Sequence, residues 1–318
     1  MKVLVTGASG FLGYQLSSAL IAKYYSVTAA ARCIEKTHCD ANTFQIVELS
    51  GKTDWSRALV DVDTVIHCAA RVHVMNDLSE DPLAESREVN TFGTLNLARQ
   101  AAQAGVKRFI FISSIKVNGE STRKGCSFSE NNHPAPQDPY GISKYEAEQG
   151  LLKIAQDTGL EVVIIRPPLV YGPGVKANFL SMMKWVSKGI PLPLGAIVNK
   201  RSFIALDNLV DLICVCVEHP KAKNQLFLAS DGHDVSTTEL LQAMAKALGR
   251  SSRLVPVPMN LLKLGASLIG NPDIAQRLCG SLQVDISKAQ VLLGWVPPVT
   301  MEQGLQKVAN AFIQKQDK

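Results

Sequence analysis

Short apolar runs alternate with amphipathic stretches along the first half of the chain. The run at 2–6 is apolar and β-branched, as expected of a buried strand, and the stretch at 11–22 carries apolar residues at helical spacing. The same pattern predicts further strands at 27–31, 44–49, 64–69, 109–113 and 162–166, and helices at 81–104 and 139–158. Strands that alternate with helices imply right-handed crossovers and an α/β fold with a doubly wound parallel sheet.

The pattern changes after residue 166. Proline and glycine interrupt the next thirty residues, which is typical of loops and short helices at a domain boundary. We therefore expect one domain over 1–166, with return segments near 201–230, and a smaller α-rich lobe over 167–318. Within that lobe a helix is expected at 237–248, begun by a cap at Ser236 or Thr237.

Composition excludes several classes of protein. The 318 residues are 46% hydrophobic and 19% charged, which indicates a globular protein with a large core and not a disordered or fibrous chain. The net charge of +5 is spread without a run of like charges, so no nucleic-acid partner is expected. The apolar stretches are short or broken by polar residues, so no membrane insertion is expected.

The seven cysteines form neither a C-x-x-C pair nor a His/Cys cluster at zinc spacing. Reduced thiols in a cytoplasmic protein are the best interpretation, because disulfides persist mainly in oxidising compartments. We expect no metal site.

A glycine-rich string lies between the first predicted strand and its helix. Gly7 allows a tight turn, Gly10 lets the backbone approach a pyrophosphate, and Gly13 permits close packing of helix on strand. The N-terminus of the helix faces the negative charge. At this position the string predicts a Rossmann dinucleotide-binding domain.

A tyrosine and a lysine lie four residues apart in the helix expected at 139–158. Tyr140 and Lys144 share one helical face, so the ammonium can stabilise the phenolate and bring the pKa of Tyr140 toward the working pH. The pair follows Ser113 and Ser114, which end the apolar run at 109–113. Ligands in open α/β folds bind at such strand ends.

Together these residues resemble the extended short-chain dehydrogenase/reductases, in the branch of nucleotide-sugar epimerases, dehydratases and ketoreductases. Further motifs resemble the same branch along nearly the whole chain: Val89-Asn90-Thr91-Phe92-Gly93-Thr94, Leu169-Val170-Tyr171-Gly172-Pro173, Arg201-Ser202-Phe203-Ile204 with Asp207, and Asp285-Ile286-Ser287-Lys288-Ala289 with Leu293-Gly294-Trp295. The resemblance implies hydride transfer between a nicotinamide cofactor and C4 of a sugar.

The resemblance also assigns residues to roles. Tyr140 would be the acid/base, Lys144 would hold the nicotinamide ribose, and Ser114 would hydrogen-bond the reacting oxygen, with Ser113 as the alternative. Substrate binding would involve Ser114, Tyr140, Asn178 and Arg201, the last two gripping the nucleotide diphosphate. Cofactor binding would involve Gly7, Ser9, Gly10, Phe11, Leu12, Gly13, Arg32, Glu48, Leu49, Ala69, Asn90, Tyr140 and Lys144.

Some positions depart from the family pattern. Arg32 stands where NAD-selective members usually carry an acidic residue, so it favours either a 2′-phosphate or a solvated or adenine-stacking side chain, and NAD and NADP both remain open. Asn118 replaces the tyrosine usual in a Val-Tyr-Gly motif. Leu169 stands where many sugar epimerases have a substrate-binding asparagine, which counts against a typical UDP-galactose epimerase.

The resemblance narrows the activity to two main hypotheses. Ser114 is followed by Ile115 and Lys116 and not by an acidic pair, which argues against a dehydratase. The first hypothesis is an NAD(P)-dependent reductase of a UDP-4-keto-6-deoxy-N-acetylhexosamine, similar to bacterial UDP-N-acetylquinovosamine dehydrogenases of surface polysaccharide synthesis. The alternative is a UDP-glucose or UDP-N-acetylglucosamine 4-epimerase with tightly bound NAD. The family also implies a homodimer formed through the helices at 81–104 and 139–158.

Two hypotheses come from outside these activities. One is a cofactor-sensing protein that kept the fold and lost turnover, against which the retained Ser114, Tyr140 and Lys144 argue. The other is a reductase of small ketones or steroids on the same fold. Asn178 and Arg201 favour a diphosphate ligand over that second possibility.

Overall fold

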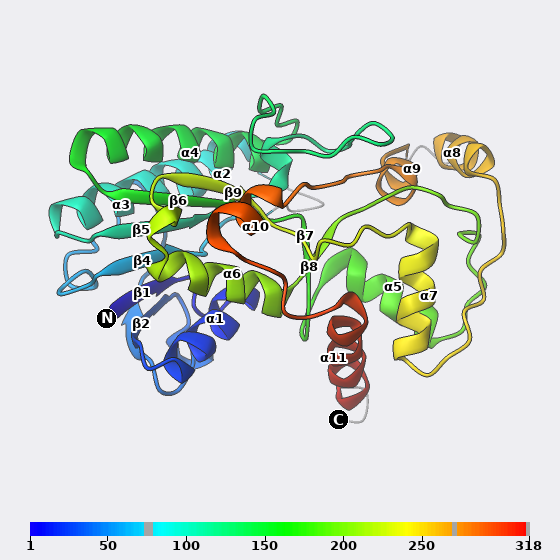
Figure 1. Cartoon of the computed structure of the whole chain (residues 1–318), viewed down its shortest axis with the longest axis horizontal. Helices are drawn as coiled ribbons and strands as arrows, with labels where there is room; N and C mark the ends of the chain where they lie inside the picture. Colours follow the sequence, from blue (N-terminus) through cyan, green and yellow to red (C-terminus); the bar gives the residue numbers. More distant parts are fainter. Residues whose placement is uncertain (73–78, 269–271, 316–318) are drawn as a thin grey trace.

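A parallel β-sheet with helices on both faces lies beside a smaller helical lobe (Figure 1). The computed structural model describes residues 1–72, 79–268 and 272–315. Within these residues the main sheet has the order β3-β2-β1-β4-β5-β6-β9, and every neighbouring pair is parallel. Its strands are β1 (Lys2–Thr6), β2 (Ser26–Ala31), β3 (Asn42–Gln45), β4 (Thr64–His67), β5 (Arg108–Ile112), β6 (Glu161–Arg166) and β9 (Gln225–Leu228). The order that begins 3-2-1-4 is that of a Rossmann fold, so the expected fold class is confirmed.

Both faces of the sheet are buried, so its strands are apolar along their whole length. Successive side chains point to opposite faces: Val3 and Val5 join one hydrophobic cluster and Leu4 joins another. One face is covered by α1 (Phe11–Ala22), α6 (Leu206–Glu218) and α10 (Ser287–Leu293). The other face is covered by α3 (Thr94–Gln103) and α4 (Pro139–Thr158), with α2 (Pro82–Arg87) beside α4.

The second lobe has a hydrophobic core of its own, built around Tyr171, Phe179, Met183 and Leu305. Two short parallel strands, β7 (Leu169–Tyr171) and β8 (Phe203–Ala205), connect this lobe to the main sheet. Its helices are α5 (Ala177–Ser187), α7 (Thr237–Ala247), α8 (Met259–Leu268), α9 (Pro272–Cys279) and α11 (Met301–Gln314). No helix in the described ranges is both long and apolar enough to cross a bilayer.

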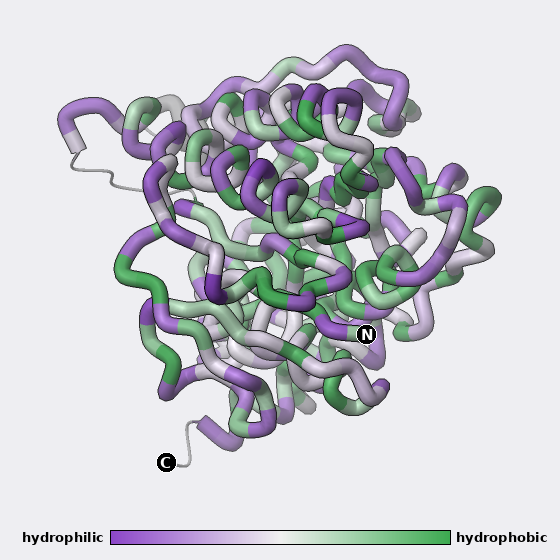
Figure 2. Tube along the Cα trace, turned by 90° about the vertical axis from the view of Figure 1, so that its left-hand side faces the viewer, coloured by the Kyte–Doolittle hydropathy of each residue, from purple (hydrophilic) through white to green (hydrophobic). Residues whose placement is uncertain are grey.

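Local chemistry sets the ends of the helices. Asp138 caps α4 by accepting a hydrogen bond from the backbone N–H of Gly141 (2.7 Å), and Gly159 ends that helix with φ +78°. Ser236, not Thr237, takes the cap of α7 and forms a capping box with Glu239. Figure 2 shows hydrophilic and hydrophobic residues alternating along helices in the upper part of its view, as expected of helices with one buried side.

Two expected elements differ in the structure, and one strand was not expected. The strand expected at 44–49 spans Asn42–Gln45 instead, and the backbone leaves the sheet after Gln45, where Val47 and Glu48 are exposed. The helix expected at 81–104 is divided by a π-helical turn at Glu88–Gly93, where Thr91 donates a hydrogen bond to the carbonyl of Ser143 in α4 (2.9 Å). Strand β9, four residues long, was not located by the apolar pattern.

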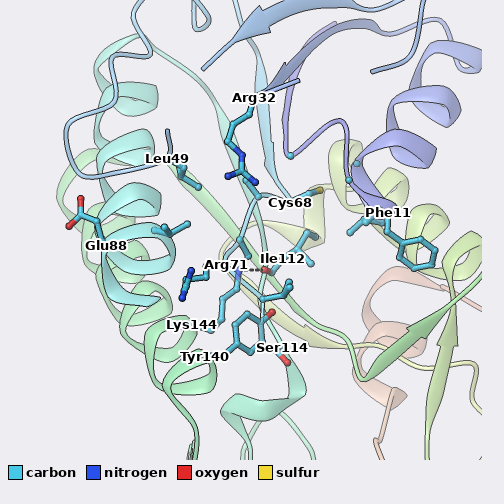
Figure 3. A pocket seen from close by; sticks show the side chains of 18 of the residues that line it. Phe11, Arg32, Leu49, Cys68, Arg71, Glu88, Ile112, Ser114, Tyr140 and Lys144 are labelled. Atoms are coloured by element: carbon cyan, nitrogen blue, oxygen red, sulfur yellow. Dashed lines mark hydrogen bonds between the residues drawn. The ribbon is translucent and has the colours of Figure 1, made fainter. Parts of the chain in front are cut away.

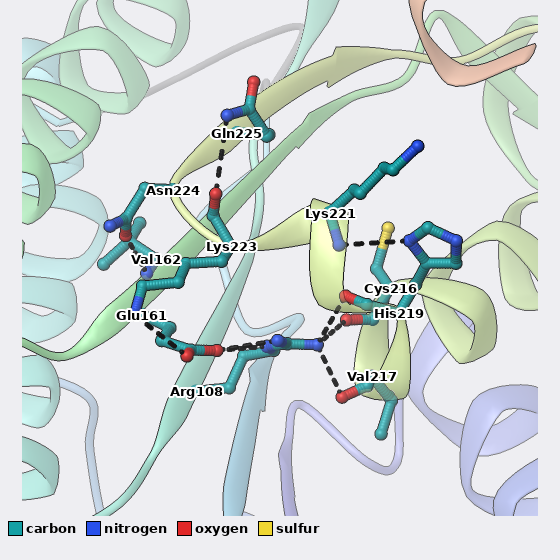
Figure 4. A network of polar contacts seen from close by, with 10 residues as sticks. All are labelled: Arg108, Glu161, Val162, Cys216, Val217, His219, Lys221, Lys223, Asn224 and Gln225. Carbon is teal, nitrogen blue, oxygen red and sulfur yellow. Dashed lines mark hydrogen bonds and ion pairs between the residues drawn. The ribbon is translucent and has the colours of Figure 1, made fainter. Parts of the chain in front are cut away.

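Arg108 closes the end of the sheet where β5 and β6 begin (Figure 4). Its Nη1 donates to the carbonyls of Cys216, Val217 and His219 at the end of α6, at 2.8, 2.9 and 3.2 Å. Its other nitrogens bond to Glu161, the first residue of β6. One buried guanidinium therefore satisfies carbonyls that the end of a helix leaves without partners.

Candidate active site

A cleft of about 1490 Å³ opens at the carboxyl ends of the central strands. Residues from the loops after β1, β2, β4, β5 and β6 line it, together with the start of α4 (Figure 3). Segments far apart in the sequence meet here because parallel strands all end at the same edge of a sheet. This is the edge at which open α/β folds bind ligands.

The glycine turn after β1 forms one wall of the cleft. Gly7 has φ +65°, and a Cβ there would lie 2.8 Å from the backbone nitrogen of Ala69. A Cβ on Gly13 would lie 2.3 Å from the carbonyl oxygen of Gly7. Gly10 caps α1 without a side-chain hydrogen bond, so the first N–H groups of the helix are available to an anion. The turn therefore has the geometry that a pyrophosphate needs.

Most residues expected at the cofactor line this cleft. They are Gly7, Ser9, Gly10, Phe11, Leu12, Gly13, Arg32, Glu48, Leu49, Ala69, Tyr140 and Lys144. Arg32 points into the cleft, whereas the ring of Phe11 turns away from it toward Gly172. In the described part of the chain Arg32 forms no ion pair.

Asn90 lies behind the wall of the cleft and does not line it. Its amide donates to the carbonyl of Arg71 and to the hydroxyl of Ser143, both at 3.0 Å, and its oxygen accepts from the N–H of Arg71 at 2.8 Å. The side chain thus fixes the backbone of Arg71, a residue of the cleft, against α4. Its contacts are those of a support and not of a direct ligand.

Ser114, Tyr140 and Lys144 meet at the end of β5. The Ser114 hydroxyl and the Tyr140 phenol share a hydrogen bond. The Lys144 ammonium donates to the carbonyl of Ile112 (2.9 Å) and lies 4.5 Å from the centre of the Phe111 ring and 5.9 Å from that of Tyr140. The helix places Tyr140 and Lys144 on one side, and the strand end brings Ser114 to them.

Burial governs the pKa values of both Tyr140 and Lys144. Burial raises the pKa of Tyr140, the charge of Asp138 adds to the effect, and the hydrogen bond from Ser114 opposes it. Burial also lowers the pKa of Lys144 to about 7, whereas its interactions with Cys68 and Glu148 act in the opposite direction. Burial therefore dominates the pKa of Tyr140 in this geometry, and the expected lowering of that pKa by Lys144, whose ammonium is bonded to the carbonyl of Ile112, stays a prediction.

Ser113 and Ser114 differ in their contacts. Both line the cleft, but the Ser113 hydroxyl donates to Glu148 at 2.5 Å and is 2% exposed. Ser114 accepts from the N–H of Lys116 (3.2 Å) and faces the phenol. The geometry favours Ser114 over Ser113 as the hydroxyl that could reach a ligand.

Asn178 and Arg201 do not line the cleft. Asn178 is exposed in the first turn of α5. The Nη1 of Arg201 donates to the carbonyls of Arg277 and Gly280, both at 3.1 Å, and burial lowers the pKa of its guanidinium. The structure does not bring these two residues together with Tyr140.

Several residues of the cleft were missed by the sequence reasoning. Cys68 and Arg71 follow β4, Ile112 ends β5, and Pro167 follows β6. Their shared signal is the position at or just after the carboxyl end of a strand, which the apolar runs already indicated. Away from the cleft, atoms of His38, Cys39 and Asp40 lie within 4.8 Å of one another at the surface, and nothing further marks that group as a metal site.

Comparison with known proteins gives consistent results. The model of the "NAD dependent epimerase/dehydratase family" matches residues 3–229. A Vibrio cholerae protein named UDP-glucose 4-epimerase is 52% identical over 316 residues, covering 98% of this chain and 96% of its own. An Escherichia coli O157:H7 protein named N-acetyl-alpha-D-glucosaminyl-diphospho-ditrans,octacis-undecaprenol 4-epimerase is 27% identical, covering 96% and 93%.

A solved structure shares the fold. The UDP-glucose 4-epimerase of Thermus thermophilus in complex with NAD superimposes with a TM-score of 0.80 at 24% identity, covering 98% of this chain and 99% of that one. At this identity the likeness speaks for the fold alone. The sheet order and the cleft at its carboxyl edge agree with it.

Proposed function

Since the chain belongs to the NAD dependent epimerase/dehydratase family, we propose that it is a UDP-hexose 4-epimerase, which inverts the hydroxyl group at C4 and keeps its NAD. The observation that carries the proposal is the 52% identity, over 98% of the chain, to the Vibrio cholerae relative named UDP-glucose 4-epimerase. The epimerase, which the motifs alone placed second, therefore replaces the C4 reductase as the leading hypothesis.

The cleft offers a place to each part of NAD. The glycine turn and the start of α1 would hold the pyrophosphate, beside the backbone of Ala69. Arg32, Glu48 and Leu49 would contact the adenosine, and Lys144 the nicotinamide ribose. Bound there, NAD supplies the acceptor that takes a hydride from C4 of the sugar and later returns it to the opposite face.

The protein residues manage the proton that accompanies the hydride. Tyr140 exchanges it with the oxygen at C4, and Ser114 hydrogen-bonds the same oxygen. Because burial raises the pKa of Tyr140, the phenolate needs a nearby positive charge. Lys144, one helical turn away, provides that charge while it is protonated.

The diphosphate of the substrate is assigned to Asn178 and Arg201. The contacts of Arg201 to the carbonyls of Arg277 and Gly280 use Nη1, and a guanidinium has five N–H donors, so phosphate oxygens can be bound through the others. As a test, UDP alone should raise the melting temperature of the purified protein, and Arg201→Gln should abolish that rise. A melting temperature that UDP leaves unchanged would count against this substrate class.

The reductase is the second candidate, and Arg32 is the observation that favours it. The guanidinium points into the cleft and has no carboxylate partner among the described residues, which suits the 2′-phosphate of an exchangeable NADP. An epimerase returns the hydride to the sugar, whereas a reductase releases its oxidised cofactor. The two candidates are therefore separated by whether the cofactor is consumed.

The deciding experiment measures both cofactor and sugar. We expect near-stoichiometric NAD in the supernatant of the denatured protein, and conversion of UDP-galactose to UDP-glucose, or of their N-acetylated counterparts, without added cofactor. Tyr140→Phe should lower this rate by about a hundredfold to ten thousandfold while NAD stays bound, because it removes only the proton carrier. An empty protein that oxidises NADPH with a 4-keto sugar would establish the reductase instead.

A further inference from the structure

A buried pair of charges lies behind the proposed catalytic residues and has no part in the mechanism above. The carboxylate of Glu148 is 1% exposed and the guanidinium of Arg166 is 3% exposed. Charges in such positions are costly to bury and call for an explanation. Glu148 belongs to α4, and Arg166 ends β6.

Glu148 and Arg166 link α4, the helix that carries Tyr140 and Lys144, to the end of β5. Glu148 lies four residues after Lys144, which lies four after Tyr140, so the three residues share one face of α4. Glu148 Oε1 accepts hydrogen bonds from Ser113 Oγ (2.5 Å) and Arg166 Nε (2.9 Å), and its Oε2 accepts from Arg166 Nη2.

These contacts hold the strand that presents Ser114. Lys144 bonds to the carbonyl of Ile112, and Glu148 to the hydroxyl of Ser113. The two residues before Ser114 are thus both fixed to α4. These two bonds, together with backbone hydrogen bonds from Ser113 to Ile165 (2.8 Å) and from Ile115 to Pro167 (3.0 Å), hold the segment that carries Ser114.

The carboxylate of Glu148, one helical turn from Lys144, also raises the pKa of that lysine against the effect of burial. The groups that face the Lys144 ammonium are His67 and Cys68 at the end of β4, and Tyr140 and Glu148 on α4. Burial lowers the pKa of His67 to about 3 and raises the pKa of Cys68 to about 12, so both are neutral near pH 7. The carboxylate among these groups is that of Glu148, which is also paired with the guanidinium of Arg166.

The pair continues toward the second lobe. Arg166 Nη1 donates to Asn118 Oδ1 (2.8 Å), and Asn118 Nδ2 donates to the carbonyl of Ser129 (3.2 Å). The neighbouring Phe128 donates its N–H to the carbonyl of Gln283 (2.8 Å), in the segment that follows α9. Asn118 stands where the family usually has a tyrosine.

We propose that Glu148 and Arg166 are positioning residues of the reaction, which keep Lys144 charged and hold Ser114 in register with Tyr140. The assignment to a reaction rests on the proposed function. The charge on Lys144 and its effect on NAD binding do not, because the ammonium lines the cleft whatever sugar the enzyme takes.

The test is the variant Glu148→Gln, which keeps the shape and removes the charge. NADH affinity is titrated by fluorescence from pH 5.5 to pH 9 on protein freed of nucleotide, and epimerase rates are measured over the same range. In the wild type we expect both to fall as Lys144 loses its proton. We expect this fall to move to lower pH by about one unit in the variant, and kcat at pH 8 to drop about tenfold or more with little change in KM.

Glu161→Gln is the matched control. Glu161 pairs with Arg108 at the end of the sheet where β5 and β6 begin (Figure 4). The variant therefore also removes a carboxylate from an arginine, but at the end of these strands that lies far from the cleft. We expect it to lower the melting temperature without moving the pH dependence of NADH affinity. Glu148→Asp, which restores the charge, should return that dependence toward the wild type.

The outcomes separate this proposal from the proposed function. If Glu148→Gln fails to fold, the double variant Glu148→Gln/Arg166→Met leaves no unpaired charge and takes its place in both titrations. An unchanged pH dependence in Glu148→Gln, an unchanged kcat in the double variant, or the same pH shift in Glu161→Gln would overturn the positioning role. A wild type that binds NADH but converts no UDP-sugar would overturn the proposed function, and the NADH titration would still decide the role of Glu148.

Discussion

His67 shows how a titratable residue beside a cofactor cleft can be purely structural. It ends β4 and is fully buried, with Nδ1 2.6 Å from the hydroxyl of Thr6 and Nε2 2.9 Å from that of Thr94. Burial, with a smaller effect of the Lys144 charge, lowers its pKa to about 3. The neutral ring therefore joins β1, β4 and α3 and carries no proton to the site.

This predicts a specific pH dependence of stability. Between pH 6.5 and pH 4.5 the unfolded imidazole takes up a proton that the folded ring refuses, so stability falls as the pH falls, by about 1.4 kcal/mol per pH unit. His67→Gln lacks that contribution. The difference in free energy of unfolding between wild type and variant, from urea titrations, should shrink by about 2 kcal/mol over this range. A constant difference would show that the folded ring accepts a proton.

Residues whose partners are close in sequence could be predicted, and those with distant partners could not. Tyr140 and Lys144 share a helix, and the glycine turn is a local motif, so their spacing was sufficient. The support given by Asn90 depends on Arg71 and Ser143, and the bonds of Arg201 on carbonyls near residue 280. Such contacts are set by the packing of whole elements, which one sequence does not encode locally.

At the scale of elements, the turn from β1 into α1 imposes the strictest local geometry of the site. Gly7 and Gly13 have backbone atoms of the turn and of Ala69 where a side chain would begin. Gly159, at the end of α4, also has a positive φ but meets nothing within 4 Å. Substitutions at Gly7 and Gly159, which both have a positive φ, can therefore separate steric exclusion from backbone strain.

We predict unequal effects of alanine at these two positions. Gly159→Ala should cost about 1 kcal/mol of stability, from backbone strain alone, and leave the NAD content unchanged. Gly7→Ala adds a clash with the Ala69 backbone and should reduce NAD content at least tenfold, besides a larger loss of stability. Denaturant titration and nucleotide release measure the two effects. Equal losses in both variants would contradict the assigned role of the turn.

The elements that the apolar pattern misjudged are those whose boundaries depend on tertiary contacts. The backbone leaves β3 early to line the cleft, and the π-helical turn at Glu88–Gly93 is held by α4. Strand β9 pairs only with β6 within the described sheet, and its partner is more than fifty residues earlier. Long strands and helices with a continuous period carried enough local signal to be placed within one or two residues.

At the scale of the whole molecule, the division at residue 166 is a boundary in sequence more than in structure. The cluster on one face of the sheet includes Leu209 and Phe227 from the middle of the chain and Ala289 and Trp295 from near its end. The sheet thus takes part of its core from the second half of the chain. The domain ranges 1–166 and 167–318 remain a proposal about which part binds which ligand.

A fragment comprising residues 1–166 should therefore not fold alone. Without α6, β9 and α10 it would expose one face of the sheet and the edge of β6. We expect it to be insoluble or to lack a cooperative melting transition by circular dichroism, and co-expression with 167–318 to restore solubility. A soluble fragment that melts cooperatively would show two independent domains.

The surface formed by α4 and the π-helical turn is our proposed homodimer interface. Phe92 is 49% exposed and Leu152 38% exposed, and α4 packs beside this turn. Light scattering should give twice the monomer mass of 34.4 kDa for the wild type and a smaller mass for Leu152→Glu, because the charge cannot be buried against a partner helix. A dimer that survives the substitution would place the interface elsewhere.

The two ends of the sheet differ in what their residues contact, and this difference decides where the protein can be redesigned. At one end the guanidinium of Arg108 donates hydrogen bonds to Glu161 and to the carbonyls at the end of α6. At the other end the loops form the cleft. Loop grafting and directed evolution for new sugars should therefore be confined to the cleft end, where sequence can vary without disturbing the frame that keeps the strands in register.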